Sequence, residues 1–184
     1  AHARAEITDF WQLVFNPSSM DRLLHVLMGA WQAGAFLVLS VSAYYLLRGR
    51  HLDFAKASMK IALCLATAAS VLQLVSGHSS ALIVSRHQPV KLAAFEGVYP
   101  ASEPAAMHLV GWVDEKSERV SGIRLPGMLS WLVHGDVSKP VTGLRSVPPE
   151  DRPPVNIVFQ SFHAMVALGM GLIALNLVGM IAWW

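Results

Sequence analysis

Two side chains in separate apolar stretches could together bind a haem iron. His25 lies near the start of one apolar stretch, and Met165 lies in another that is far away in the sequence. An imidazole nitrogen and a thioether sulfur on facing membrane helices can coordinate iron from both sides, which leaves no open position. A haem held in this way transfers electrons and does not bind oxygen. The pair therefore predicts a six-coordinate electron-transfer haem.

Small residues follow each candidate ligand after one helical turn. Gly29 stands four positions after His25, and Gly169 stands four positions after Met165. A flat macrocycle has to approach a helix closely beside its ligand, and glycine permits that approach. The same glycines would also suit tight helix packing, and methionine often only packs. The histidine is the stronger indication, because an ionisable residue inside a membrane segment is a functional candidate by default.

His163 is a competing ligand on the same stretch as Met165. On a helix the two side chains would point about 160° apart, so they cannot both face one iron. Met165 also lies deeper in its stretch than His25 does. As a helix the last stretch would be about 45 Å long, against roughly 30 Å for a hydrocarbon core. Its first turns can protrude, which would bring Met165 level with His25.

Three stretches are long and apolar enough to cross a bilayer, which needs about 20 mostly apolar residues. The first runs from Leu23 to Leu47 and the third from Val155 to Trp184, and neither contains a formal charge. The second begins near Ile61 and runs to about Val75, and Phe54 to Met59 could lengthen it at its start. Only 14% of the residues are charged, against about a quarter in soluble proteins. We therefore predict an all-α integral membrane protein with three transmembrane helices.

A long proline-rich loop separates the second and third stretches. Nine of the ten prolines lie between positions 89 and 154, so this segment cannot be one continuous helix. Within it, Leu125 to Val133 is apolar but too short to span, which favours an interfacial or re-entrant piece. The predicted segments are an interfacial start (1–21), a helical hairpin (22–84), the loop (85–154) and a final transmembrane helix (155–184).

Positive charge in the short turn predicts the orientation of the hairpin. Arg48, Arg50 and Lys56 lie within this turn, and such clusters are typical of cytoplasmic connections. The loop 85–154 is then extracytoplasmic. The net charge of +2 and the absence of a basic run exclude a nucleic-acid partner.

The remaining metal-binding side chains carry little signal. One cysteine, Cys64, excludes an internal disulfide, and its apolar surroundings predict a buried thiol. Four loop histidines have no metal-ligand spacing, so we interpret them as surface or interfacial residues: His78, His87, His108 and His134.

Several motifs carry a family resemblance. They are Asn16-Pro17 through His25, Tyr44 to Arg50 with Phe54-Ala55-Lys56, Gln88 to Gly97 with its Lys-Leu-Ala-Ala-Phe-Glu core, Leu125 to Ser130, and Phe162 to Val166. With His25 and Met165 in the same order, nearly the whole chain resembles the central segment of subunit I of cytochrome bd quinol oxidases. The compact loop resembles the short-loop, cyanide-insensitive-like subclass.

The resemblance implies a role for four residues. It makes His25 and Met165 the axial ligands of the low-spin haem b, usually called b558. It places Lys91 and Glu96 in the loop that binds and oxidises quinol, either ubiquinol or menaquinol. Quinol oxidation releases protons together with electrons, so a proton acceptor such as Glu96 is needed near the electron acceptor.

The resemblance also implies partners. The chain would be part of a terminal oxidase, a quinol:oxygen oxidoreductase in the bacterial inner membrane, together with the rest of subunit I and subunit II. Haem b595 and haem d are expected in the complete complex, ligated by helices that this chain lacks. Better-known members have an arginine at the position of His163, so a role for His163 in balancing haem charge stays open.

Two alternatives remain open. One is a different membrane electron carrier with haem b, although such carriers typically use pairs of histidines. The other is a membrane subunit without redox chemistry, in which His25 and Met165 only pack.

Overall fold

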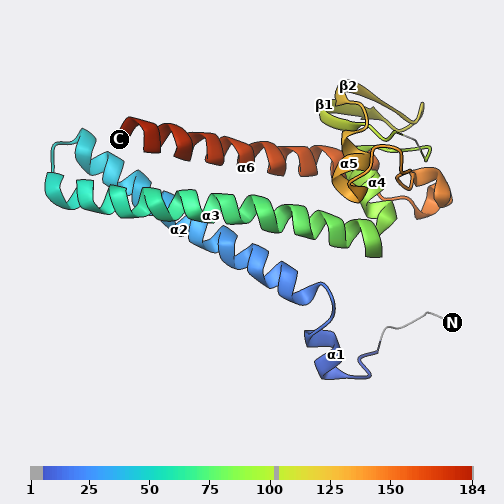
Figure 1. Ribbon diagram of the computed structural model, residues 1–184, viewed down its shortest axis with the longest axis horizontal. Helices are drawn as coiled ribbons and strands as arrows, with labels where there is room; N and C mark the ends of the chain where they lie inside the picture. Colours follow the sequence, from blue (N-terminus) through green and yellow to red (C-terminus); the bar gives the residue numbers. More distant parts are fainter. Residues whose placement is uncertain (1–5, 102–103, 184) are drawn as a thin grey trace. The chain divides into compact units, whose positions relative to one another are not determined.

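The structure, a computed structural model, describes residues 6–101 and 104–183 in two compact units (Figure 1). The helical unit comprises residues 1–80 and 172–184, and the loop unit comprises residues 81–171. Each unit is described by itself. The first five residues of the predicted interfacial segment and the last residue of the predicted third helix lie outside the described residues.

Helices make up the helical unit. They are α1 (Phe10–Val14), α2 (Ser19–Leu47), α3 (Leu52–His87) up to residue 80, and the end of α6 (Val155–Trp183). Three helices, α2, α3 and α6, are long and apolar enough to cross a membrane. The prediction of a mostly helical chain with three candidate membrane spans is thus confirmed. Helix α3 continues well beyond the predicted end near Val75, because helical backbone bonds persist where the side chains become polar.

Burial in the helical unit is inverted relative to a soluble protein. Except for Leu63, the buried positions on α2 and α3 are small or polar, such as Gln32 and Ser70. Large apolar side chains point outward, and Ile61 is 72% exposed. Such side chains need no protein partner in lipid, so helices meet through small and polar residues instead. The prediction of a buried Cys64 is wrong for this reason, because the thiol lies exposed on α3.

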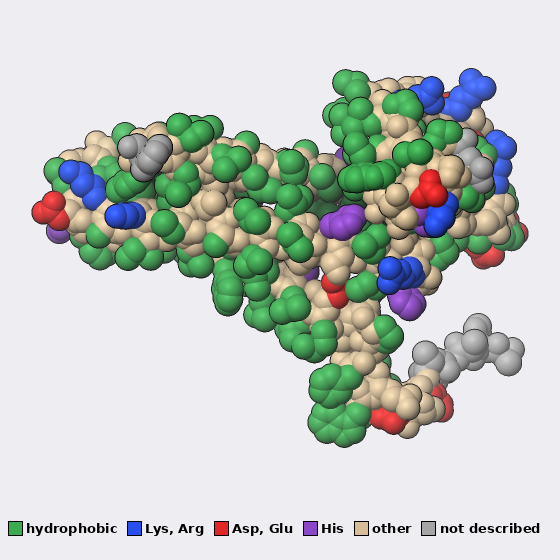
Figure 2. Space-filling view, in the orientation of Figure 1, with side chains coloured by type: hydrophobic (Ala, Val, Ile, Leu, Met, Phe, Trp, Pro, Cys, Tyr) green, Lys and Arg blue, Asp and Glu red, His purple; other side chains and the backbone are tan. Residues whose placement is uncertain are grey.

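Charged side chains gather at the turn between α2 and α3, while the visible face of these helices is largely hydrophobic (Figure 2). Between the two helices, polar side chains pair in antiparallel order. The Gln32 amide donates to Ser70 Oγ at 2.8 Å, and the Ser80 hydroxyl donates to the Asp21 carboxylate. From α6, Asn176 Nδ2 also donates to Ser70 Oγ, at 2.8 Å. Bonds of this kind contribute about 0.6 kcal/mol each in membrane proteins and fix the helical register.

The loop unit contains a β-hairpin that the all-α prediction did not include. Its elements are α4 (Pro89–Glu96), β1 (Met107–Asp114), β2 (Arg119–Leu125), α5 (Met128–His134), the short 3-10 turns Leu144–Ser146 and Pro149–Asp151, and the first half of α6. The strands are antiparallel. Helix α5 overlaps most of the predicted short apolar piece. The buried core comprises Leu92, Ala93, Ala94, Val98, Tyr99, Ala105, Val113, Leu129, Val141, Leu144, Val155 and Phe159.

The turn of the hairpin is anchored to the start of α6. Glu115 Oε1 accepts a hydrogen bond from the backbone N–H of Asn156 at 2.8 Å, in the first turn of the helix. A carboxylate at this position satisfies a free backbone donor and interacts favourably with the helix dipole. One turn later, Gln160 Nε2 donates to the carbonyl oxygen of Gly111 on β1 at 2.7 Å.

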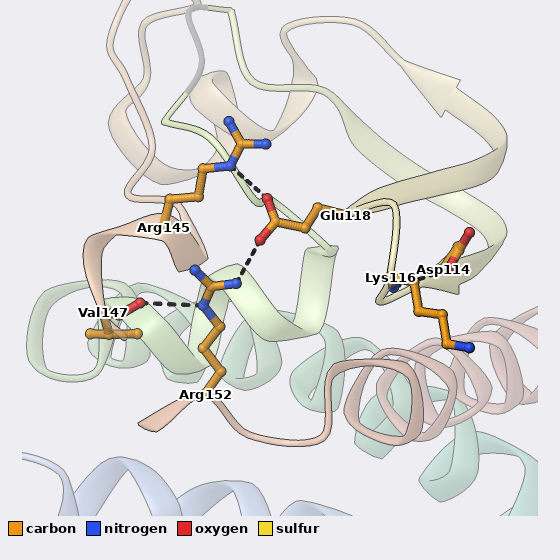
Figure 3. A network of polar contacts seen from close by, with 6 residues as sticks. All are labelled: Asp114, Lys116, Glu118, Arg145, Val147 and Arg152. Carbon is orange, nitrogen blue, oxygen red and sulfur yellow. Dashed lines mark hydrogen bonds and ion pairs between the residues drawn. The ribbon is translucent and has the colours of Figure 1, made fainter. Parts of the chain in front are cut away.

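Glu118, in the same turn, binds two arginines (Figure 3). Its carboxylate oxygens accept from Arg145 Nε at 2.6 Å and from Arg152 Nη1 at 2.7 Å. These hydrogen bonds, that of Arg152 foremost, lower the pKa of Glu118. Arg152 also donates to the carbonyl oxygen of Val147 at 3.3 Å. One carboxylate thereby joins the hairpin to the segment that leads into α6.

Gly97 ends α4 in a left-handed conformation (φ 67°) directly beneath the hairpin. A Cβ at this position would overlap the Val120 side chain of β2. Gly135 ends α5 with nearly the same backbone angle (φ 68°) but has open space around it. A comparison of alanine substitutions at the two glycines therefore distinguishes the cost of the left-handed backbone from the cost of steric overlap with Val120.

We expect Gly135→Ala to cost about 1–2 kcal/mol of stability, from the left-handed backbone alone. Gly97→Ala should cost roughly a further 1–3 kcal/mol, because Val120 is tethered to a strand and cannot move aside freely. Hydrogen–deuterium exchange of the α4 and β2 peptides in the purified protein measures the difference. Equal protection in the two variants would contradict the close packing of Gly97 against β2.

Candidate functional site

Helix α4 places Lys91 and Glu96 in the loop unit. The helix begins with Pro89, whose fixed φ suits the first helical position, and ends at Gly97, which takes the left-handed cap. Lys91 is exposed, whereas Glu96 is only 5% exposed. The structure therefore presents the cation to the surroundings and encloses the carboxyl group.

Lys91 lies beside a pair of aromatic rings. Its Nζ is 5.6 Å from the centroid of the Phe95 ring, a cation–π contact that contributes about 0.5–1 kcal/mol at an exposed site. The Phe95 ring stacks on that of Phe162 at 4.6 Å, with only 4° between the planes. The stack joins α4 to the first half of α6 and limits the positions that the Lys91 ammonium can take.

Glu96 has an unusually raised pKa. Its Oε2 atom is buried and has no hydrogen-bond partner. Burial disfavours the ionised form and raises the pKa to about 7, and the backbone of His108 offsets this only in part. A carboxyl group with this pKa can take up and release a proton near neutral pH, as a general base requires.

His108 was interpreted from the sequence as a surface or interfacial residue, but it is a half-buried neighbour of Glu96. Its Nδ1 donates to the Glu96 carbonyl oxygen at 3.2 Å. Burial, the largest effect, lowers the pKa of His108, so the ring is neutral at pH 7. The other loop histidines, His78, His87 and His134, are exposed. The spacing of residues in the sequence does not predict that His108 is half-buried beside Glu96, because this contact forms only when β1 packs against α4.

His163 is held by two backbone carbonyl groups. Its Nδ1 lies 2.9 Å from the Phe159 oxygen and its Nε2 lies 2.8 Å from the His108 oxygen. Its ring stacks on the buried Phe159 ring at a centroid distance of 3.9 Å. A neutral imidazole has one N–H, so it can donate to only one of these two oxygens. Met165 on the same helix is 57% exposed.

A pocket also opens beside α4, and neither Lys91 nor Glu96 lines it. Its walls come from the end of α3, from α4 and α5, and from the segment that follows α5: Ser85, Pro89, Leu92, Val133, His134, Pro140, Val141 and Thr142. This pocket therefore does not include the two residues that the sequence predicts for quinol oxidation.

His25 lies half-buried in the helical unit and contacts α3 through both ring nitrogens. Nδ1 is 2.9 Å from Ser76 Oγ, and Nε2 is 3.0 Å from Gln73 Nε2. Gly169, four positions after Met165, has open space where a Cβ would be. Imidazole and thioether donors with glycines close by fit an axially ligated haem. His25 and Met165 belong to different units, whereas Lys91, Glu96 and Met165 share one.

These features define a class: a chain with three helices that are long and apolar enough to cross a membrane, and with a folded unit that encloses a carboxyl group. The sequence profile of the family described as "Cytochrome bd terminal oxidase subunit I" matches residues 1–184. The chain belongs to this family.

Three known proteins document the similarity. Cytochrome bd-II ubiquinol oxidase subunit 1 of Escherichia coli (strain K12) is 39% identical over 82% of this chain and 30% of its own length. Cytochrome bd ubiquinol oxidase subunit 1 of Bacillus subtilis (strain 168) is 35% identical over 97% of this chain and 41% of its own. The solved bd oxidase from Geobacillus thermodenitrificans matches 92% of this chain and 39% of its own, with a TM-score of 0.84 and 30% identity. The chain thus spans less than half of these relatives.

The enclosed Glu96 carboxyl makes stability depend on pH. Its pKa is 4.5 in an ordinary setting and about 7 here, so the folded state favours the protonated form. Wild-type stability should therefore fall as the pH rises from about 4.5 to 7, by roughly 3 kcal/mol in total. In Glu96→Gln this loss should disappear. Thermal unfolding of the purified protein at several pH values tests it, with the exposed Glu150→Gln as the matched control. Parallel pH profiles for Glu96→Gln and wild type would refute the assignment.

Proposed function

We propose that this chain provides the quinol-oxidising loop and the haem b ligands of a cytochrome bd-type quinol oxidase. Two relatives are named as ubiquinol oxidase subunits, and the chain covers only part of each. The observation that carries the proposal is Glu96, an enclosed carboxyl with a pKa near 7 on a folded loop unit. The activity, a quinol:oxygen oxidoreduction, would belong to the assembled complex.

Glu96 would act as the proton acceptor. Oxidation of a quinol to a quinone releases two protons and two electrons, so a base must stand close to the quinol hydroxyl group. At neutral pH about half of the Glu96 groups are ionised, since the pKa is about 7. The residue can therefore accept a proton from one quinol and release it before the next arrives.

Lys91 would orient the quinol. Its exposed ammonium, held beside Phe95, can donate a hydrogen bond to a quinol oxygen and stabilise the negative charge that develops as the proton leaves. The stacked rings of Phe95 and Phe162 offer an apolar surface that suits an aromatic head group. Lys91 and Glu96 would thus divide binding and proton transfer between them.

His25 and Met165 would be the two axial ligands of a low-spin haem b of the b558 type. When bound, this haem would accept electrons from quinol and pass them towards the oxygen-reducing haems. Both ligands are electrically neutral, and a thioether favours the reduced iron. The His163 ring stacks on the buried Phe159 ring, whereas the Met165 side chain is 57% exposed, which supports Met165 over His163 as the second ligand.

The complete complex supplies the other parts. On this proposal they are the rest of subunit I, subunit II, and the haem b595 and haem d that this chain does not ligate. The substrate is ubiquinol or menaquinol. The complex lies in the bacterial inner membrane, with the loop unit on the extracytoplasmic side.

Met165→Leu roughly keeps the side-chain volume but removes the sulfur. We expect the low-spin haem b spectrum to be lost, or its midpoint potential to fall, because the thioether ligand favours reduced iron. Reduced-minus-oxidised spectra and redox titration of the purified oxidase measure both. Met170→Leu, on an exposed methionine of the same helix, is the matched control. A Met165→Leu spectrum and potential equal to wild type would exclude Met165 and direct attention to His163.

Glu96→Gln keeps the size of the side chain but removes the base. It should lower the rate of haem reduction by quinol by about 10²–10⁴-fold, while chemical reduction by dithionite stays unchanged. Lys91→Met should mainly raise the apparent KM for quinol. Stopped-flow reduction in the complete complex measures both, with the exposed Glu150→Gln and Lys116→Met as matched controls. Unchanged quinol kinetics in both site variants would remove this loop from the quinol site.

A further inference from the structure

The hydrogen bonds around His25 have a defined direction. The Ser76 hydroxyl donates to the Gln73 carbonyl oxygen at 3.2 Å, so its single proton is already used. Its contact with His25 Nδ1 at 2.9 Å then requires the imidazole to donate and the hydroxyl oxygen to accept. The proton of the neutral ring is thereby placed on Nδ1, and Nε2 keeps its lone pair.

The Nε2 lone pair accepts from the side-chain amide of Gln73 at 3.0 Å. The same amide is poorly held elsewhere, because its Oε1 atom is buried without a hydrogen-bond partner. A movement of this amide away from Nε2 would break no hydrogen bond of Oε1, and it would make His25 Nε2 available. A ligating histidine typically donates its other ring nitrogen to a fixed acceptor, which is the arrangement that Ser76 provides.

Small residues keep the imidazole in this orientation without enclosing it. A Cβ on Gly77, the residue after Ser76, would lie 3.5 Å from His25 Cε1. A Cβ on Gly29, one turn after His25, would lie 3.6 Å from Gln73 Nε2. The ring thus has backbone on one side and a movable amide in front of Nε2.

We propose that Ser76 is the positioning residue of His25, which sets its tautomer and ring orientation for iron binding through Nε2. For iron to bind Nε2, the Gln73 amide, which contacts this nitrogen at 3.0 Å, would have to move aside. This inference rests on the proposed function, since it takes His25 to be a haem ligand. It adds two residues on α3 whose part in the site cannot be seen from motif spacing.

The test uses the complete purified oxidase as wild type and in five variants, the fifth being His25→Ala. Ser76→Ala removes the acceptor, and Ser76→Thr keeps it. Ser80→Ala is the matched control, because Ser80 lies one turn further on α3 and bonds to Asp21 instead. Gln73→Leu removes the amide. The readouts are haem b per protein, haem affinity by re-addition after extraction, and the midpoint potential of the haem that remains.

Ser76→Ala should weaken haem b binding by about 10–100-fold, as is typical when the hydrogen-bond partner of a ligating histidine is removed. Its midpoint potential should rise, because the lost hydrogen bond made the imidazole a stronger donor to oxidised iron. Ser76→Thr should restore both quantities, and Ser80→Ala should change neither. Gln73→Leu should bind haem at least as tightly as wild type.

Three results would overturn the inference. Wild-type affinity and potential in Ser76→Ala would exclude a positioning role. Equal losses in Ser76→Ala and Ser80→Ala, with an unchanged potential, would show helix packing alone. A loss in Gln73→Leu as large as that in Ser76→Ala would show that the amide does not give way. His25→Ala distinguishes failure of the proposed positioning role of Ser76 from failure of the proposed ligand role of His25. If this variant retains a low-spin haem b, His25 is not a haem ligand.

Discussion

The scarcity of water between apolar helices is the constraint on which the rest of this structure depends. A polar side chain placed there must find a protein partner or lose several kcal/mol. In the helical unit the side-chain oxygens of Gln73 and Asn176 are buried without a partner. Several other such groups have one: Gln32 and Asn176 share the hydroxyl of Ser70, and Asp21 accepts from Ser80. His25 belongs to the same series, since both of its ring nitrogens have partners on α3. Its surroundings therefore support helix packing, and on the proposed function they would also orient His25 as a ligand.

In the loop unit, Glu96 also has a buried side-chain oxygen without a partner, and here the group is ionisable. The raised pKa is a product of the whole unit, because desolvation requires the hairpin to cover the end of α4. Gly97 permits that cover by taking a left-handed cap against Val120, and the fully buried Phe159 ring lies close to the same glycine. A sequence change far from Glu96, in the hairpin or its anchors, would thus alter the affinity of this carboxyl for protons.

Hydropathy predicted the long helices because lipid-facing helices are apolar all round, which is a strong signal in a single sequence. It failed at the end of α3, where the side chains turn polar but the helix continues. It also missed the hairpin, although Met107–Asp114 and Arg119–Leu125 are rich in β-branched and apolar residues on either side of a charged turn, a readable strand signal. The high proline content of the same segment favoured turns over strands. The sequence motif around Lys91 and Glu96 pointed to the segment that forms α4 as a candidate site. The burial of Glu96 beside His108 could not be predicted, since it depends on contacts between residues that are distant in the chain.

The hairpin turn has a consequence for handling the protein. Residues 115–118 are exposed or nearly so and would be an obvious place for an affinity tag or an insertion. Their spacing is nevertheless fixed at both ends, because Glu115 caps α6 and Glu118 bridges two arginines. A lengthened turn could keep one attachment but not both. Exposed positions 137–140, after α5, carry no comparable anchor to another element except the contact of His134 with Pro140. Epitopes are better inserted there, and natural variation in loop length should be tolerated there more readily than at the hairpin.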